Sequence, residues 1–409
     1  MAIKALKGTK DILPEESYVW RYISDCAESV FKKYNFKKIS TPVIEATELY
    51  QRGVGDSTDI VNKEMYSFQK SDHNITLRPE NTAGVVRAFL EHNMQRDIQP
   101  VKLWYSGPMF RYERPQAGRQ SQFHQIGVEM FGSADPSADA DCIKTAVEFL
   151  KSVGLYNLTV EINSLGCSRC RTTFREKIKT LIEPLLPELC SDCKRRYETN
   201  PLRILDCKNP NCTALFEKNN LFDSLSKIDL CDNCSEHYEK LKQYLGILKV
   251  EYVENPFLVR GLDYYTRTVF EIKSENLGSQ NAVCGGGRYD NLVETLGGPS
   301  VPAVGWAVGV ERIYSLIEKP QMQKADYFVI SENISEALKF ADKIRTYGKI
   351  AELDYSSRKF TKQIEKASKI ANYAVILGES EIKEKKVTVK DLETFSQSTI
   401  SQENFFSTL

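Results

Sequence analysis

Two alternating segments flank a short polar segment, and this pattern constrains the fold more than any other in the chain. The first segment, VKLWYSGPMFRYE, begins at Val101, and the second, FHQIGVEMFG, begins at Phe123. Both alternate in the way expected of half-buried strands, and few residues separate them. The sequence therefore predicts a long antiparallel hairpin with a polar tip.

The tip of this hairpin is rich in arginine and glutamine. Arg111 ends the first segment, and the turn also contains Glu113, Arg114, Gln116, Arg119 and Gln122. The planar guanidinium group of arginine suits bidentate phosphate recognition. A charged loop that only contacts water is an equally good interpretation of these residues taken alone.

Length and charge exclude some classes of protein. The 409 residues suffice for about two to three domains. Lys+Arg and Asp+Glu are equal at 55 each, so a polyanion would have to be held by local patches. The N-terminal residues lack a secretory signal pattern, and no apolar run approaches the ~18 residues of a membrane-spanning helix. We expect a cytoplasmic protein without membrane contact.

The composition changes twice along the chain. Residues 165–250 read as charged helical segments with most of the cysteines, and strand and glycine signals return after them. After Pro320 the pattern alternates β-α-β-α-β, which favours a small α/β domain. We predict a domain over residues 1–320, interrupted by an insertion over 165–250, and a second domain over 321–409. A helix is also predicted over 79–93, with Pro79 in its first turn.

Eight of the eleven cysteines form four spaced pairs in the insertion. Paired thiolates at this spacing are the usual halves of a tetrahedral zinc site, so four pairs allow up to two sites. Such zinc would be structural, because four sulfurs leave no open position; reduced, half-buried thiols are the alternative. The candidate ligands are Cys167, Cys170, Cys190, Cys193, Cys207, Cys212, Cys231 and Cys234.

Glycines and arginines gather again between residues 260 and 312. The sequence GGGR at 285–288 allows a close backbone approach, but neither GxGxxG nor a GxxxxGK[ST] phosphate loop occurs. Arg260 precedes Tyr264 and Tyr265, whose rings suit a small heteroaromatic ligand, although a place in the core is the better interpretation of the two tyrosines taken alone. Arg312, taken alone, reads better as an ion-pair residue.

Taken together, these segments resemble the histidyl-tRNA synthetase family of class II aminoacyl-tRNA synthetases. The resemblance covers essentially the whole chain. It rests on the stretches LKGTKDILP, TLRPENTAGVVRA, WYSGPMFRYERPQAGRQSQFHQIGVEMFG, NPLRILDCKNP, LVRGLDYYTRTVFEI, CGGGRYDNL and VGWAVGVERI.

The resemblance implies an α+β fold with a class II antiparallel-sheet catalytic core, a helical Cys-rich insertion and a C-terminal α/β anticodon-binding domain. It implies a histidine–tRNA ligase that activates L-histidine with ATP and Mg²⁺ and transfers it to the 3′ end of tRNA(His). A homodimer is also implied. Zinc is not a general requirement of this family.

The resemblance also implies roles for individual residues. Arg111, Glu113 and Arg312 match ATP-binding positions, and Arg260 matches an additional catalytic arginine, so that Arg260, Arg111 and Arg312 are the catalytic candidates. Gln116 and Arg119 lie where the loop approaches the tRNA acceptor end. The histidine-binding candidates are Glu80, Asn81, Thr82, Gln125, Glu129, Arg260, Tyr264 and Tyr265.

Two other classes of protein compete with this interpretation. A non-catalytic regulatory paralogue of ATP phosphoribosyltransferase should have lost the catalytic arginines and the C-terminal domain, and this chain keeps both. A zinc-dependent RNA-binding module without catalysis explains the cysteines but leaves the segments of 260–312 without a role.

Overall fold

The chain divides into two compact units, Met1–Pro320 and Gln321–Leu409. Within the described residues, no helix combines the length and apolar character needed to cross a membrane. The computed structural model describes residues 3–55, 58–113, 120–207, 209–224, 229–274, 282–356 and 359–409.

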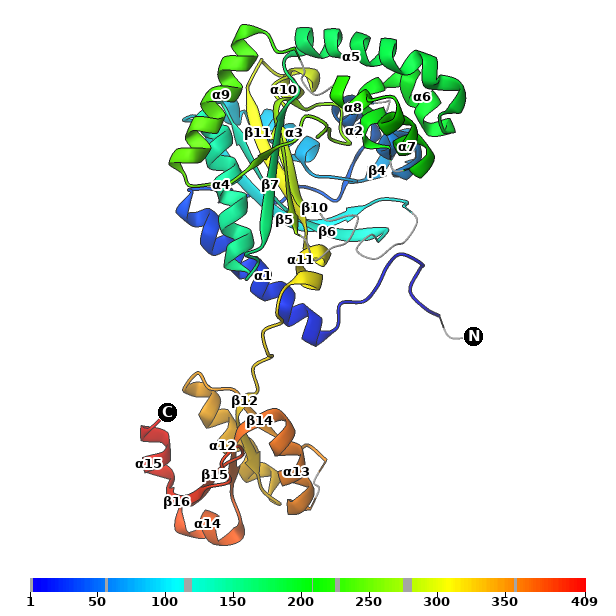
Figure 1. Ribbon diagram of the computed structural model, residues 1–409. Helices are drawn as coiled ribbons and strands as arrows, with labels where there is room; N and C mark the ends of the chain where they lie inside the picture. The colour runs from blue at the N-terminus through cyan, green and yellow to red at the C-terminus, as the bar shows by residue number, and fades with distance from the viewer. Residues whose placement is uncertain are drawn as a thin grey trace. The chain divides into compact units, whose positions relative to one another are not determined.

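The first unit is built on an eight-stranded, mainly antiparallel sheet (Figure 1). Only the outer pairs β1/β5 and β7/β8 are parallel among the strand pairs of this sheet. The strand order is β1 (Lys37–Lys38), β5 (Val101–Phe110), β6 (Gln122–Phe131), β11 (Ala303–Gly309), β10 (Ala282–Arg288), β9 (Thr266–Ser274), β7 (Leu158–Ser164) and β8 (Val253–Glu254).

The predicted hairpin is confirmed as β5 and β6. The two strands pair antiparallel over their whole length, from Val101 opposite Phe131 to Phe110 opposite Gln122. Each also has a second neighbour in the sheet, β1 and β11 respectively. The hairpin therefore lies in the interior of the sheet near Leu103 and Trp104, where both of its strands have an outer neighbour.

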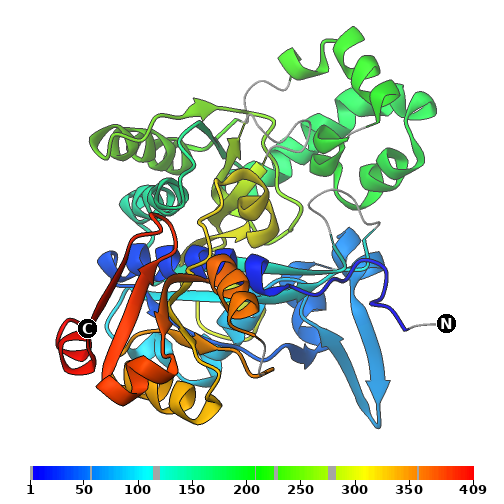
Figure 2. The same ribbon diagram turned by 90° about the horizontal axis from the view of Figure 1, so that it is seen from below.

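The two faces of the sheet have different partners. Val128 and Met130 point into the main apolar core, whereas Phe131 belongs to a cluster on the opposite face, as strand alternation requires. The helices that contribute to the main core are α1 (Pro14–Lys33), α4 (Pro136–Ser152), α9 (Asp232–Ile247) and α11 (Val310–Leu316). The helices α4 and α9 lie side by side in both views (Figures 1 and 2).

Most of the cysteine-rich region forms a small helical module with its own apolar core, which runs from Phe174 to Leu221. It lies apart from α1 in both views (Figures 1 and 2). Leu241 and Leu245 of α9, in contrast, pack in the main core. The elements of the module are α5 (Ser168–Ile182), η3 (Glu183–Glu188), α6 (Ser191–Thr199), η4 (Pro201–Asp206), α7 (Pro210–Lys218) and α8 (Leu221–Ser224).

The remaining elements of the first unit lie near the start of the chain and near β10. The predicted helix over 79–93 is wrong at its start, since α3 begins at Thr82 and Pro79 lies before the helix. The helix begins there because the Glu80 carboxylate accepts hydrogen bonds from its first free N–H groups. These elements are β2 (Ile44–Ala46), α2 (Thr47–Val54), η1 (Ile60–Glu64), β3 (Tyr66–Lys70), β4 (His73–Leu77), α3 (Thr82–Glu91), η2 (Met94–Arg96) and α10 (Leu292–Thr295).

The second unit confirms the predicted β-α-β-α-β alternation. Its three parallel strands are extended by an antiparallel pair, and apolar clusters cover both faces of the sheet. The strand order is β13 (Ala351–Leu353), β12 (Ala325–Ile330), β14 (Ala371–Ile376), β15 (Lys386–Asp391) and β16 (Gln397–Ser401). The helices are α12 (Ile334–Thr346), α13 (Phe360–Ile370), α14 (Glu379–Glu384) and α15 (Gln402–Ser407).

Candidate active site

A cavity of about 970 Å³ opens on the face of the main sheet that carries Glu129 and Glu271. This volume is at the upper end of the range for small-molecule sites. The cavity brings together ten residues from the sequence analysis that are far apart in the chain. They are Glu80, Thr82, Arg111, Glu113, Gln125, Glu129, Arg260, Tyr264, Tyr265 and Arg312.

Asn81, alone among the described ATP- and histidine-binding candidates, is not part of this lining. Asn81 is buried beneath it, and its Oδ1 accepts a hydrogen bond from the Thr41 hydroxyl at 2.6 Å. Its side chain is therefore used to hold the start of α3 rather than to face the cavity. Gln116 and Arg119 lie outside the described residues.

Glu129 is a buried carboxyl group with two hydroxyl partners. Its Oε1 accepts from the Thr82 hydroxyl at 2.8 Å, and its Oε2 accepts from the Tyr289 hydroxyl. Burial raises the pKa of Glu129 to about 8, although the hydrogen bonds from Tyr289 and Thr82 act in the opposite direction. A carboxyl group in this state can exchange a proton with a bound base near neutral pH.

Glu80 lies beside Glu129 but has a different environment. Its carboxylate accepts from the backbone N–H groups of Thr82 at 2.8 Å and Ala83 at 3.0 Å. Burial raises the pKa of Glu80, and these hydrogen bonds oppose that shift. Glu80 thus fixes the start of α3, and with it the Thr82 hydroxyl that binds Glu129.

Gln125 carries a polar atom that nothing in the described part of the chain satisfies. Its Oε1 is buried without a hydrogen-bond partner, and the side chain lines the cavity from β6. A buried unpaired acceptor costs about 1–3 kcal/mol. The atom is therefore suited to a ligand that brings a hydrogen-bond donor.

Arg111 is fixed at the base of the hairpin tip. Its Nε–H donates to the Pro79 carbonyl at 2.8 Å, and its guanidinium group lies 5.3 Å from the centre of the Phe123 ring. Glu113 Oε1 is 3.8 Å from Arg111 Nη1. These contacts hold the guanidinium group in place while it still lines the cavity.

Four further arginines line the cavity, and two of them, Arg260 and Arg312, belong to the predicted site. Arg260 forms an ion pair with Glu271 of β9, and its Nε is buried without a partner among the described residues. Arg312 of α11 donates to the Ala282 carbonyl. Three guanidinium groups from separate parts of the chain therefore face one cavity, an arrangement that suits a ligand with several phosphate groups.

Glycine at position 305 is required by this site. Gly305 of β11 pairs with Glu129 of β6, and a Cβ atom built on it would overlap Glu129 Oε2. We expect Gly305→Ala to displace Glu129, to destabilise the fold by about 1–3 kcal/mol and to raise the KM for the substrate that Glu129 contacts. Urea unfolding and steady-state kinetics measure both effects.

The matched control for this prediction is Gly246→Ala. A Cβ atom built on Gly246 meets nothing within 4 Å, and the residue lies inside helix α9. Alanine there should leave KM unchanged and stabilise the fold by up to about 1 kcal/mol. Equal kinetics for Gly305→Ala and the wild type would contradict the role given to Gly305.

The eight cysteines of the insertion form two groups of four. Within each group the four sulfur atoms lie within 4.8 Å of one another, close enough to hold a metal ion. The first group is Cys167, Cys170, Cys231 and Cys234, and the second is Cys190, Cys193, Cys207 and Cys212.

Sequence reasoning missed two residues that the cavity depends on. Tyr289, directly after GGGR, donates to Glu129, and Glu271 pairs with Arg260. Strand alternation could have placed Glu271 on the cavity face, since Phe270 and Ile272 beside it point into the main core. No local pattern in the sequence indicates the contact of Tyr289.

Comparison with known families gives matches over nearly the whole chain. A family model described as Histidyl-tRNA synthetase matches residues 8–170 and 204–313, and one described as Anticodon binding domain matches 324–409. The histidine–tRNA ligase of Halothermothrix orenii is 48% identical, with 97% of this chain and 96% of that protein covered. That of Aquifex aeolicus is 49% identical, with 97% and 98% covered.

Solved structures give the same picture. The apo histidyl-tRNA synthetase of S. aureus matches with a TM-score of 0.81 at 36% identity, covering 100% of this chain and 99% of that one. A Bacillus halodurans chain described as an ATP phosphoribosyltransferase regulatory subunit/histidyl-tRNA synthetase matches at 0.68 and 22% identity, covering 92% and 98%. The second match shows the fold alone.

Proposed function

Because this chain belongs to the histidyl-tRNA synthetase family, we propose how its cavity residues share the work of a histidine–tRNA ligase. In this reaction L-histidine reacts with ATP to give histidyl-adenylate and pyrophosphate. Histidine is then transferred from the adenylate to the 3′ end of tRNA(His). The class II fold expected from the sequence is confirmed by the family matches. Met1–Pro320 is proposed as the catalytic domain with its insertion, and Gln321–Leu409 as the anticodon-binding domain.

We place the histidine side chain against Glu129. Imidazole has one nitrogen that donates and one that accepts, and Glu129 near its pKa of about 8 can serve either need. Gln125 offers an unpaired acceptor, and Tyr264 and Tyr265 supply flat faces in the same lining. Such a pocket rejects analogues that lack the ring nitrogens, because its buried polar groups would be left unpaired.

Arg111 and Arg312 are proposed to bind the phosphates of ATP, with Glu113 near the adenine. The histidine carboxylate attacks the α-phosphorus in line, so negative charge grows on the phosphoryl oxygens and the leaving pyrophosphate. Arg260 acts on that developing charge, and no protein nucleophile is required.

Mg²⁺ is expected to enter with ATP. Glu311 lines the cavity, and its carboxylate oxygens are the hard ligands that this ion prefers. When bound, Mg²⁺ would offset negative charge on the phosphates.

Gln116 and Arg119 remain proposed contacts of the tRNA acceptor end, and structural zinc is proposed for the insertion. We also propose a cytoplasmic homodimer, which a solution mass measurement would test.

The observation that carries this proposal is the meeting of a buried carboxyl group and three arginines in one cavity. It also weighs against a non-catalytic regulatory subunit, which has no use for the three arginines. It weighs equally against an RNA-binding module without ATP turnover.

The test is ATP–pyrophosphate exchange without tRNA, run with histidine and with each other amino acid. We expect exchange with histidine alone, followed by charging of tRNA(His). Folded protein that shows no exchange would favour the regulatory subunit, and exchange with another amino acid would contradict the assignment of histidine to the cavity.

A further inference from the structure

The sulfur atoms of the insertion are spaced as around single metal ions. Cys167 Sγ is 3.7 Å from Cys170 Sγ and 4.0 Å from Cys231 Sγ, and Cys190 Sγ is 3.9 Å from Cys207 Sγ. Four sulfurs at about 2.3 Å from one zinc ion lie about 3.8 Å apart in a tetrahedron. A disulfide would bring two sulfurs to about 2.0 Å. The observed distances fit the first arrangement.

Backbone N–H groups already point at these sulfurs. The Cys231 N–H donates to Cys170 Sγ at 3.3 Å, and the Cys190 N–H donates to Cys212 Sγ at 3.3 Å. Such bonds stabilise thiolates around a metal and fix the ligands in place. Each group also has two buried and two half-buried cysteines, so part of each site is shielded from water.

The two groups occupy different places in the fold. The first joins the segment that leaves β7 at Ser164 to the segment that enters α9 at Asp232, so it closes the base of the module. The second lies inside the module, where Cys193 and Cys212 belong to its own apolar core. Each group contains a full set of four ligands, so two ions are needed to occupy both groups.

We infer that the insertion holds two separate structural zinc ions, and that Arg171 and Asn200, in the segments that these ions would hold, position the loop that carries Arg260, Tyr264 and Tyr265. The zinc sites stand on the sulfur geometry alone. The positioning role rests on the proposed function, since it concerns the histidine pocket. No residue of the module need touch histidine for this role.

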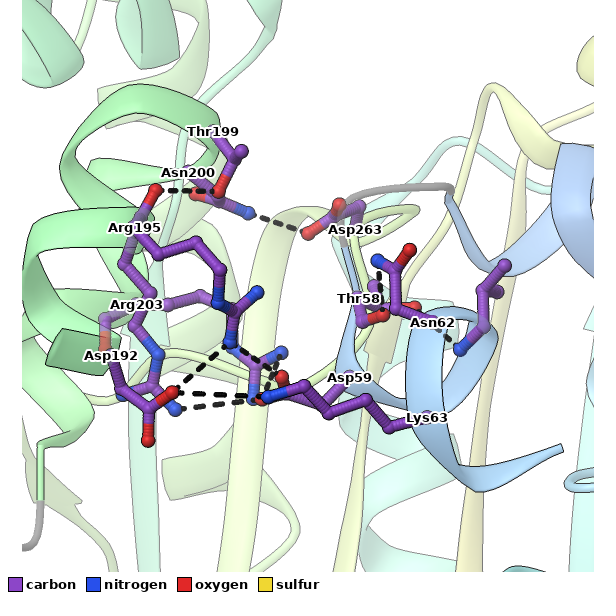
Figure 3. A network of polar contacts seen from close by, with 12 residues as sticks. Thr58, Asp59, Asn62, Lys63, Asp192, Arg195, Thr199, Asn200, Arg203 and Asp263 are labelled. Carbon is purple, nitrogen blue, oxygen red and sulfur yellow. Dashed lines mark hydrogen bonds and ion pairs between the residues drawn. The ribbon is translucent and has the colours of Figure 1, made fainter.

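Contacts from both zinc-bearing segments reach this loop. Arg171, which follows Cys170, donates to the Asp263 carbonyl at 3.3 Å and the Tyr265 carbonyl at 3.0 Å. The Asn200 amide donates to Asp263 Oδ1 at 2.6 Å, just before Tyr264 (Figure 3). These bonds hold the backbone of Asp263 and Tyr265, and the side chain of Asp263, on either side of Tyr264.

An ion-pair network joins the same module to the catalytic core near η1. Asp59 lies 2.7 Å from Arg195, 3.6 Å from Arg196 and 3.7 Å from Arg203, and Lys63 lies 3.9 Å from Asp192 (Figure 3). All three arginines lie between the ligands Cys193 and Cys207. The second zinc ion would therefore hold the short elements α6 and η4 that present them.

A small module of this kind needs such support. Its core is formed by short helices, and two of its elements, η3 and η4, are 3-10 helices. Modules of this size bury little apolar surface, and a bound metal is a common means of fixing them. Without metal, α6 and η4 would be held by side-chain packing and by the polar contacts of Arg195, Arg203 and Asn200.

The first test is the metal content of the purified full-length protein, by mass spectrometry of the elements. We expect about two zinc ions per chain in the wild type, and about one in Cys167→Ser/Cys170→Ser and in Cys190→Ser/Cys193→Ser. The control Cys26→Ser, outside both groups, should keep about two. Iron in place of zinc, no metal, or loss of all metal in one double variant would overturn the inference of two separate zinc sites.

The second test addresses positioning with a variant that leaves every cysteine in place. Asn200→Ala should keep about two zinc ions and raise the KM for histidine about tenfold in exchange, with a smaller change in the KM for ATP. Thr199→Ala is the matched control and should behave as the wild type, because the Thr199 hydroxyl donates to the Arg195 carbonyl within α6. Wild-type KM for histidine in Asn200→Ala would overturn the positioning role.

These measurements separate this inference from the proposed function. A wild-type protein that holds zinc but gives no exchange contradicts the function and leaves the metal sites standing. A protein that exchanges with histidine but holds no zinc contradicts the metal sites and leaves the function standing.

Discussion

Replacing Arg260 by alanine is expected to lower histidine-dependent ATP–pyrophosphate exchange by about 10³-fold or more, while the protein remains folded. The guanidinium group lines the cavity beside Gly285, where a Cβ atom would overlap it. Its partner Glu271 keeps it charged and aimed, and its Nε has no partner in the described part of the chain. The loss should therefore fall on the charge that develops during reaction, and single-turnover adenylate formation would measure it.

The control variants separate charge from geometry. Arg260→Lys keeps the charge but loses the planar fork, so we expect activity between those of the alanine variant and the wild type. Circular dichroism and the unfolding midpoint of Arg260→Ala should resemble those of the wild type. Exchange at the wild-type rate in Arg260→Ala would remove this residue from the catalytic set.

Replacing Arg288 by alanine is expected to cost about 3–5 kcal/mol of the free energy of unfolding, the largest stability effect we predict. Arg288 and Asp139 are both 0% exposed, and Arg288 Nε donates to Asp139 Oδ1 at 2.7 Å. Arg288 also donates to Asp290 at 2.8 Å and to the Ser133 carbonyl at 2.6 Å. Alanine would leave the Asp139 carboxylate buried with its cationic partner gone.

Urea unfolding measures this effect, and Arg21→Ala is the matched control. The ion pair of Arg21 with Asp25 spans 3.7 Å, with Arg21 83% and Asp25 68% exposed, so its removal should change stability by less than about 0.5 kcal/mol. Equal urea-unfolding midpoints for Arg288→Ala and the wild type would contradict a stabilising role of the buried ion pair.

The local patterns of the sequence predicted local structure well. The β5/β6 hairpin and the alternation of the second unit depend on neighbouring residues, whose periodicity can be read directly. The order of the main sheet could not be predicted in this way. For example, β9 lies between β7 and β10, and the module intervenes between β7 and β9 in the chain.

The site residues came from resemblance rather than from their own patterns. Taken alone, Arg312 reads as an ion-pair residue and the two tyrosines as core. The structure places all three in the cavity lining, and the tyrosines also belong to a buried apolar cluster. The motif GGGR shows why the role of a residue cannot be predicted from its neighbours in the sequence alone. Gly285 makes room for Arg260, whereas Arg288, three residues later, is wholly buried and joins β10 to α4 through Asp139. One short motif thus serves both the site and the core.

Because Glu129 of β6 pairs with Gly305 of β11, the surroundings of Glu129 are completed only late in synthesis on the ribosome. The hairpin of β5 and β6 emerges early, but the neighbour that completes the surroundings of Glu129 is among the last parts of the first unit to be made. Until Gly305 has left the exit tunnel, β6 has an open hydrogen-bonding edge. Nascent chains stalled before β11 should therefore depend on chaperones, and those long enough for Gly305 to have left the exit tunnel should not.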